Sequence, residues 1–263
     1  MTGTHLIGWP LVDLCRTPNG PRDRQLLMGE AVEVTDAPAP PSSSGLTRGS
    51  PPGWIAVRAV RDGYPGHIPE AALGRGARVT HRVCARATHL YPSPDFKTPE
   101  RAMLSLGARL EVSAEGDRFA ETPQGFVPRA HLAPLDRPET DPVAVAARLL
   151  GTPYLWGGNS ALGIDCSGLV QIACLACDIP CPGDSDEQEG ALGHPLPDDA
   201  PLQRNDLLFW RGHVAWVSDP DTLLHANAHH MAVTFEPLHD ALARIEAGGD
   251  GPVTARKRLR AAG

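Results

Sequence analysis

The chain has 263 residues, of which 41% are hydrophobic and 21% charged, and this composition predicts a folded, soluble protein of one to three domains. Its formal net charge of -7 argues against nucleic acid as a main partner, because neutralising phosphates requires clustered Lys and Arg. No apolar run approaches the ~18–20 residues of a membrane helix, and charges from Asp13 onward interrupt the N-terminal segment. We therefore expect no signal peptide, no membrane partner and a cytoplasmic location, in which the six cysteines are reduced thiols.

An internal repeat organises the first half of the chain. Residues 26–34 (LLMGEAVEV) and 104–112 (LSLGARLEV) share an apolar pair, a glycine and a final Glu-Val. Residues 66–73 (GHIPEAAL) and 125–132 (GFVPRAHL) share a glycine, a β-branched residue before proline, and a final leucine. Copies of about 60–70 residues made of short alternating strands predict two small β-barrels. The Gly-x-(β-branched)-Pro ending resembles bacterial SH3-like domains.

The two copies differ mainly by an insertion at residues 36–53, which is rich in Pro, Ser and Gly. This composition predicts a long mobile loop, and the sequence leaves open whether the loop has a role at a site. We place the first barrel at residues 1–75 and the second at residues 76–137.

The second half changes character. Asp141 followed by Pro142 begins a predicted helix that ends at Gly151, and Asp165 caps a second helix that begins near Cys166. The acidic stretch around residues 184–189 is expected to be a solvated loop. Strand-like runs then lie at 206–210, 213–217, 222–226 and 232–236, with a helix near 238–246 and a strand near 252–258. Helices followed by an antiparallel sheet predict an α+β domain over residues 138–263.

Cys166 is the first candidate for chemistry. A helix N-terminus carries about half a positive charge and favours a thiolate, although a lone cysteine there is more often buried filler. The flanks strengthen the functional interpretation. The loop 153–158 (PYLWGG) contains two adjacent glycines, which permit positive φ and close backbone approach.

Two histidines complete the candidate site. His213 opens one predicted strand, and His225 lies near the end of the next. If the connecting turn has an odd number of residues, or if a bulge intervenes, both imidazoles project on one face of the sheet. One histidine then takes the proton from Cys166 and the other orients the first.

The string PYLWGG…DCSGLV…DLLFWRGHVAWV…LLHA resembles the NlpC-type cell-wall cysteine peptidases, which have a papain-like fold. The resemblance covers roughly residues 141–258 and implies that Cys166, His213 and His225 are nucleophile, base and orienting histidine. Asn205 stands where the family usually has glycine, but asparagine tolerates positive φ better than most residues.

The resemblance implies hydrolysis of the γ-D-glutamyl–diamino acid amide bond in peptidoglycan stem peptides. Cytoplasmic members with two SH3-like domains resemble recycling enzymes that act on murein tripeptide or tetrapeptide fragments with a free N-terminal L-Ala. The expected partner is therefore a peptide of the type L-Ala-γ-D-Glu-diamino acid, and neither a cofactor nor a metal is expected. The choice between diaminopimelate and lysine, and the oligomeric state, stay open.

The same resemblance implies further site residues. Tyr154 would support the oxyanion. Substrate contacts would come from Asp165, Ser167 and Ser185 in the peptidase domain, and from Glu30 and Tyr64 in the first barrel. The carboxylates of Asp165 and Glu30 are suited to bind the ammonium group of a free N-terminal L-Ala.

Two other functions remain open. The chain is alternatively a wall-peptide binding or scaffolding protein with an inactive peptidase domain, or another amidase or acyltransferase on the papain-like scaffold. A metal site at the C-x2-C-x3-C run of Cys174, Cys177 and Cys181 is the less favoured interpretation, because the run lacks a second half with metal-ligand spacing.

Overall fold

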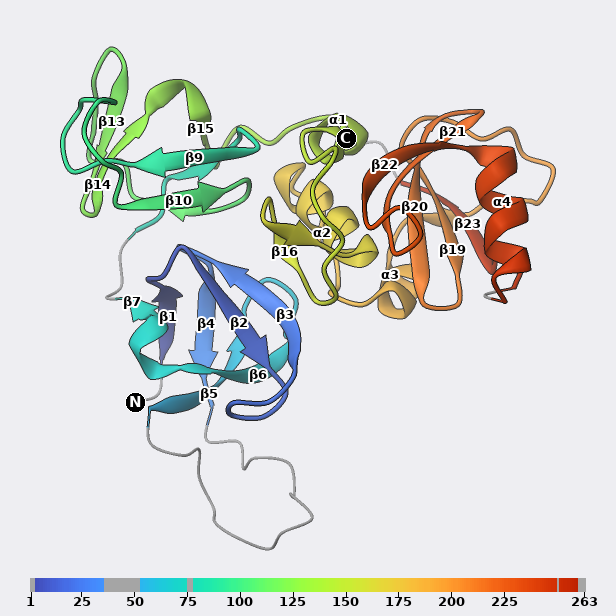
Figure 1. The fold of residues 1–263 in the computed structure, drawn as a ribbon, viewed down its shortest axis with the longest axis horizontal. Coiled ribbons are helices and arrows are strands. Elements are labelled where there is room, and N and C mark those ends of the chain that lie inside the picture. The colour runs from blue at the N-terminus through green and yellow to red at the C-terminus, as the bar shows by residue number, and fades with distance from the viewer. Residues whose placement is uncertain (1–2, 36–52, 75–77, 250, 260–263) are drawn as a thin grey trace, which may run out of the picture. The chain divides into compact units, whose positions relative to one another are not determined.

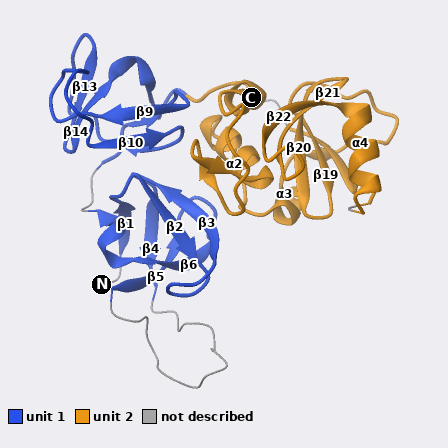
Figure 2. Cartoon of the chain, in the orientation of Figure 1, with its two compact units in different colours: residues 1–137 blue, residues 138–263 orange. Residues whose placement is uncertain are grey.

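An all-β region precedes an α+β domain in the computed structural model, which describes residues 3–35, 53–74, 78–249 and 251–259. The predicted fold class is thereby confirmed. The chain divides into two compact units, residues 1–137 and 138–263 (Figure 2). Residues 36–52 of the predicted mobile loop lie outside the described residues. No helix in the described part of the chain combines the length and the hydropathy needed to span a membrane.

The first seven strands form one antiparallel sheet in the order β3-β2-β6-β5-β4-β1-β7 (Figure 1). Alternating apolar residues from these strands point inward, and Leu14, Leu26 and Ile68 are fully buried in the resulting core. The strands are β1 (Thr4–Ile7), β2 (Leu11–Cys15), β3 (Arg22–Leu27), β4 (Ala31–Val34), β5 (Trp54–Ala59), β6 (Pro65–Pro69) and β7 (Leu73–Gly74).

The described residues of the second half of this unit form three smaller antiparallel sheets, with orders β10-β9, β11-β8-β15 and β12-β13-β14. Val83, Leu104 and Val127 are buried among them. The strands are β8 (His81–Val83), β9 (Ala87–Leu90), β10 (Ala102–Ser105), β11 (Arg109–Leu110), β12 (Ala114–Glu115), β13 (Phe119–Thr122), β14 (Gly125–Pro128) and β15 (Leu132–Pro134).

The two sequence repeats take the same local structure. Gly29 and Gly107 occupy equivalent turns with φ of 77° and 90°, a region that favours glycine. The Gly-x-x-Pro segments form β6 and β14, and each runs into a 3₁₀ turn, Glu70–Ala72 or Arg129–His131. Each turn leads into a short strand, as the repeat predicts.

The turn at Gly29, in the first copy of the repeat, also contacts the second copy. The Arg109 N–H donates a hydrogen bond of 2.8 Å to the Met28 carbonyl. A Cβ atom at Gly29 would lie only 2.1 Å from the Arg109 carbonyl oxygen. Gly29 is therefore required both for its φ and for the close approach of the second repeat.

The described residues of the second unit include four helices and a six-stranded sheet in the order β18-β23-β19-β20-β21-β22 (Figure 1). The helices are α1 (Pro142–Ala147), α2 (Cys166–Ala176), α3 (Ser185–Ala191) and α4 (Leu238–Ala247). The strands are β16 (Asn159–Ser160) and β17 (Gly163–Ile164), which pair with each other, and β18 (His194–Pro195), β19 (Asp206–Trp210), β20 (His213–Asp219), β21 (Thr222–Asn227), β22 (Ala232–Pro237) and β23 (Ala255–Arg258).

Helix α2 is buried along almost its whole length and contacts β20 and β21. Helix α4 packs on the sheet through Ala241 and Ile245, which meet Leu208, Ala215 and Leu223. These contacts fix the start of α2 and the ends of β20 and β21, where the candidate residues lie.

The expectation of a solvated loop around residues 184–189 was wrong. Residues Ser185–Ala191 form α3, because Gln188 is fully buried and its Nε2 donates to the carbonyl oxygens of Ser167 (2.9 Å) and Pro182 (3.0 Å). The acidic residues Asp186 and Glu187 occupy the first turn of α3, where negative charge is favourable.

Candidate active site

Cys166 is the first residue of α2, as predicted. The carboxylate of Asp165 caps the helix by accepting a hydrogen bond of 2.6 Å from the Gly168 N–H. The thiol is 6% exposed, and its Sγ lies 4.0 Å from the carbonyl oxygen of Gly212. The helix N-terminus favours the thiolate form of a cysteine in this position.

The loop before the nucleophile depends on both of its glycines. Gly157 has φ of 71°, and its N–H donates to Asp165 Oδ2 at 2.9 Å. A Cβ atom at Gly158 would lie 2.5 Å from the Gly163 carbonyl oxygen. Asp165 therefore ties the loop to the start of the helix, and both of its carboxylate oxygens accept hydrogen bonds within the protein.

The two predicted histidines meet. Nε2 of His213 lies 2.9 Å from Nδ1 of His225, and the ring centroids are 5.1 Å apart. The register of β20 and β21 shifts between Val217 and Asp219, and such an irregularity is one of the two conditions under which the sequence predicts both imidazoles on one face. His225 is 1% exposed, so its ring is held without access to bulk water.

Two residues that the sequence did not single out extend this arrangement. Nε2 of His225 lies 2.8 Å from Oε2 of Glu236, at the end of β22. Arg244 of α4 donates from Nε and Nη2 to the two oxygens of Glu236, each at 2.8 Å. The sequence carries one weak signal for this contact, a glutamate that ends an apolar strand followed by an arginine on the next helix.

Burial and charge set the protonation of this group. Burial is the main effect that lowers the pKa of His213 to about 3, with smaller lowering effects from His225 and Arg244 and an opposing effect from Glu236. Burial also lowers the pKa of His225. Burial opposes ionisation of Glu236, but hydrogen bonds from Arg244 and His225 outweigh it and hold the pKa of that carboxyl below its usual range. At neutral pH the imidazoles are neutral and the carboxylate is ionised.

Tyr154 stays protonated near the nucleophile. Burial raises the pKa of its hydroxyl, and negative charge at Cys166 and Asp165 raises it further. Its backbone N–H donates to the Met231 carbonyl at 2.9 Å, which anchors the loop to the turn after β21. A protonated phenol is a hydrogen-bond donor, so Tyr154 has the chemistry that its predicted role at the oxyanion requires.

Ser167 and Ser185 lie on neighbouring helices of the same unit. Ser167 Oγ donates to Asp165 Oδ1 at 3.3 Å and is buried. Ser185 is the first residue of α3, which Gln188 fastens to the start of α2. Their contacts with a substrate stay predictions.

Glu30 and Tyr64 belong to the other unit. Glu30 is 6% exposed; its Oε1 pairs with Arg61 and its Oε2 accepts from the Leu27 N–H at 3.0 Å. The Arg24 guanidinium lies 5.7 Å from the centre of the Tyr64 ring. Both residues are thus held within the first barrel, and their predicted contacts with a substrate stay predictions.

Asn205 adopts the conformation that its replacement of a glycine requires. Its φ is 72°, and its side-chain Oδ1 accepts a hydrogen bond of 3.0 Å from the Val143 N–H at the start of α1. The substitution therefore preserves the turn before β19 and adds a link to α1.

The cysteines away from the site are free thiols. Cys174 and Cys181 are buried and hydrogen-bonded to each other, which raises the pKa of Cys174. Among the described residues, no three His, Cys, Asp or Glu side chains are arranged to hold a metal ion.

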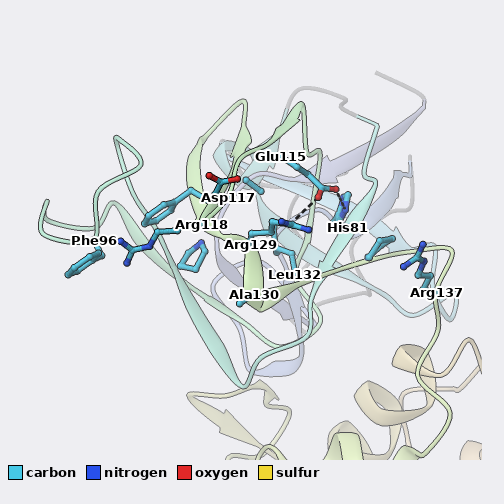
Figure 3. Close-up of a pocket in the computed structure, with 13 residues that line it drawn as sticks. His81, Phe96, Glu115, Asp117, Arg118, Arg129, Ala130, Leu132 and Arg137 are labelled. Atoms are coloured by element: carbon cyan, nitrogen blue, oxygen red, sulfur yellow. Dashed lines mark ion pairs between the residues drawn. The ribbon is translucent and has the colours of Figure 1, made fainter.

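A cavity of about 870 Å³ lies in the second half of the first unit (Figure 3). None of the residues that line it is a candidate catalytic residue. Within it Arg129 pairs with Glu115 at 3.2 Å, and the Glu115 carboxylate also lies 3.6 Å from His81. Phe96 and Arg118 line the other end, with the guanidinium 5.1 Å from the ring centre. No residue of this cavity was predicted to be functional.

Residues 151–244 match the NlpC/P60 family. A gamma-D-glutamyl-L-lysine dipeptidyl-peptidase from Bacillus cereus is 30% identical over 244 residues, which are 82% of this chain and 71% of that protein. A dipeptidyl-peptidase 6 from Lysinibacillus sphaericus is 40% identical over 98 residues, which are 37% of this chain. That match covers 36% of the Lysinibacillus protein, so this chain spans about a third of that relative's length.

A solved structure has the same fold as this chain. The crystal structure of an NlpC/P60 family protein from Bacillus cereus superposes with a TM-score of 0.76, covering 98% of this chain and 99% of that one. The two sequences are 19% identical over this superposition, so the similarity shows a shared fold.

Proposed function

This chain belongs to the NlpC/P60 family, and from that premise we propose that it is a cysteine peptidase that cuts the γ-D-glutamyl–diamino acid bond of peptidoglycan stem peptides. The observation that carries the proposal is the 30% identity over 244 residues to a protein named gamma-D-glutamyl-L-lysine dipeptidyl-peptidase. The thiol at the start of α2 and the hydrogen-bonded histidine pair supply the chemistry.

The proposed reaction has two stages. His213 accepts the Cys166 proton, and the thiolate attacks the γ-carbonyl carbon to form a tetrahedral oxyanion. The backbone N–H of Cys166 and the Tyr154 hydroxyl donate to this oxyanion, and one such donor is worth ~3–4 kcal/mol in the transition state. His213 then protonates the leaving amine, and a water molecule, deprotonated by His213, hydrolyses the thioester and releases the acid.

The proposed substrate is a murein tripeptide or tetrapeptide with a free N-terminal L-Ala, processed in the cytoplasm during cell-wall recycling. The carboxylate of Asp165, beside the nucleophile, favours the ammonium group of such a peptide. Free thiols suit a reducing compartment. Fractionation of the native cells and immunoblotting test the location, and recovery of the protein only in the wall or medium would contradict it.

The substrate proposal is tested with four peptides: L-Ala-γ-D-Glu-L-Lys, its diaminopimelate analogue, and an N-acetylated form of each. Mass spectrometry should detect L-Ala-D-Glu from the free peptides and no cleavage of the acetylated ones. Cleavage of free and blocked peptides alike would contradict the requirement for a free amine. Cleavage of none would contradict the peptidase proposal and favour a binding protein or another acyl chemistry.

Cys166→Ala should abolish this turnover, because it removes the thiol that attacks the γ-carbonyl carbon, while the thermal unfolding midpoint stays within a few degrees of the wild type. Cys84→Ala is the matched control, since it removes a thiol from the other unit, and it should retain full activity. Residual turnover in Cys166→Ala would remove Cys166 from the mechanism.

A further inference from the structure

His213, His225, Glu236 and Arg244 form an unbroken line of hydrogen bonds. We propose that Glu236, held by Arg244, is a positioning residue that fixes the tautomers of both histidines and leaves Nδ1 of His213 as the proton acceptor. The assignment of the tautomers stands on the hydrogen-bond geometry together with an ionised carboxylate and neutral imidazoles, and its catalytic consequence rests on the proposed function.

The argument starts at Arg244, whose guanidinium has only donors. It donates from Nε and Nη2 to both oxygens of Glu236, each at 2.8 Å, so both oxygens act as acceptors. Oε2 also receives the contact from His225 Nε2 at 2.8 Å. Because an ionised carboxylate has no proton to give, His225 must carry its proton on Nε2.

A neutral imidazole has one N–H, so Nδ1 of His225 is then a bare acceptor. This nitrogen lies 2.9 Å from Nε2 of His213, and a hydrogen bond at that distance needs one donor. His213 therefore carries its proton on Nε2, and its Nδ1 holds the lone pair. The preceding residue, Gly212, is the one whose carbonyl oxygen lies 4.0 Å from the Cys166 thiol.

Because the contact is buried, water does not easily take the place of the Glu236 carboxylate as the acceptor for His225. Glu236 is 6% exposed and His225 is 1% exposed, so bulk water does not reach their contact easily. The charged and titratable groups that act on the two rings come from four elements and one turn. The rings themselves lie on β20 and β21, Glu236 on β22, Arg244 on α4 and His230 after β21. Among these groups the carboxylate of Glu236 is the acceptor that reaches Nε2 of His225.

The first experiment reads the tautomers directly. Long-range ¹H–¹⁵N correlation spectra of the imidazole rings are recorded at neutral pH in Cys166→Ala, which removes the coupling to the thiol. Both His213 and His225 should show a protonated Nε2 and a bare Nδ1. In Cys166→Ala/Glu236→Gln the amide places a donor against either Arg244 or His225, so both rings should shift toward the Nδ1–H form.

The change at His213 is the decisive readout, because that ring lies one hydrogen bond beyond the ring that Glu236 contacts. Unchanged spectra for both rings in the Glu236→Gln protein would overturn the proposal. A structural ion pair alone predicts a lower unfolding midpoint without any change of tautomer. The spectra can be read even if the wild type cleaves none of the four peptides, so the two proposals fail separately.

The second experiment is kinetic. Glu236→Gln should lower kcat by roughly 10²–10⁴ with KM within about threefold, as in serine proteases, where replacing the buried aspartate behind the catalytic histidine costs ~10⁴ in kcat. Arg244→Lys keeps a cation against Glu236 and should lower kcat by less than about tenfold. Glu246→Gln, the same chemical change at an exposed position of α4, should match the wild type. Equal kcat for Glu236→Gln and Glu246→Gln in an active enzyme would overturn the catalytic consequence.

Discussion

His225 is buried and His213 is half-buried, both as neutral rings, and this has a consequence for stability. The pKa of His213 is lowered to about 3 in the folded protein, whereas an imidazole in an unfolded chain has a pKa near 6.5. Below pH ~6.5 the unfolded state therefore binds more protons than the native state. The free energy of unfolding should fall as the pH falls, by at most about 1.4 kcal/mol per pH unit for each such histidine.

His213→Gln tests this at a single residue. Urea unfolding between pH 7.5 and pH 5 should give a smaller loss of unfolding free energy for the variant than for the wild type. His239→Gln, which changes a ring that is 94% exposed, should keep the wild-type slope. Identical slopes for all three proteins would contradict a neutral His213 with a lowered pKa.

Single residues also show what a sequence can predict about a site. Cys166, His213 and His225 each carry a local signature, a helix start or the beginning or end of an apolar strand. Glu236 has no such local signature. It reaches His225 only because β21 pairs with β22 in a register that sets His225 opposite Thr234 and places Glu236 diagonally beside His225. Pairing register depends on tertiary structure, so the sequence alone did not reveal this contact.

Helix caps act at the scale of the element. Asp141 and Asp165 cap α1 and α2 in the same way, each accepting a hydrogen bond from the backbone three residues on, at 3.2 Å and 2.6 Å. Only Asp165 also holds the loop that carries Trp156-Gly157-Gly158. The two caps therefore form a matched pair in which stability and activity are separable.

Asp141→Ala and Asp165→Ala should each cost about 0.5–2 kcal/mol of unfolding free energy through the lost cap. Asp165→Ala should in addition lower kcat/KM by roughly tenfold or more, because the start of α2 and the glycine loop lose their shared anchor. Chemical denaturation and peptide hydrolysis measure the two effects. An equal loss of activity in both variants would show that the cap itself, and not the loop, matters.

Elements with local signals were predicted well. Helix α2 and strands β19 to β22 lie where the caps and apolar runs predicted them. Helix α1 ends at Ala147, short of the predicted Gly151, and β23 begins at Ala255, after the predicted start. Helix α3 was missed because its stability comes from a buried glutamine that contacts two distant carbonyls, and its sequence is otherwise polar.

At the scale of the whole molecule, each of the two units has a buried core of its own. The line from His213 to Arg244 lies entirely within residues 138–263. A fragment of these residues should unfold cooperatively in urea, with an unfolding free energy in the usual range of ~5–15 kcal/mol. It should also keep the tautomers of the full chain. A fragment without a cooperative transition would show that the unit needs the rest of the chain to fold.

The repeated modules of the first unit are not interchangeable parts. Gly29 meets the Arg109 carbonyl of the second copy, so the second copy limits which residues the first can carry at that position. A chimera that transplants another module into residues 1–75 must bring a glycine to this turn, however well its own core is built. The same contact means that selection acts differently on the two copies at this turn, whether or not they share an ancestor.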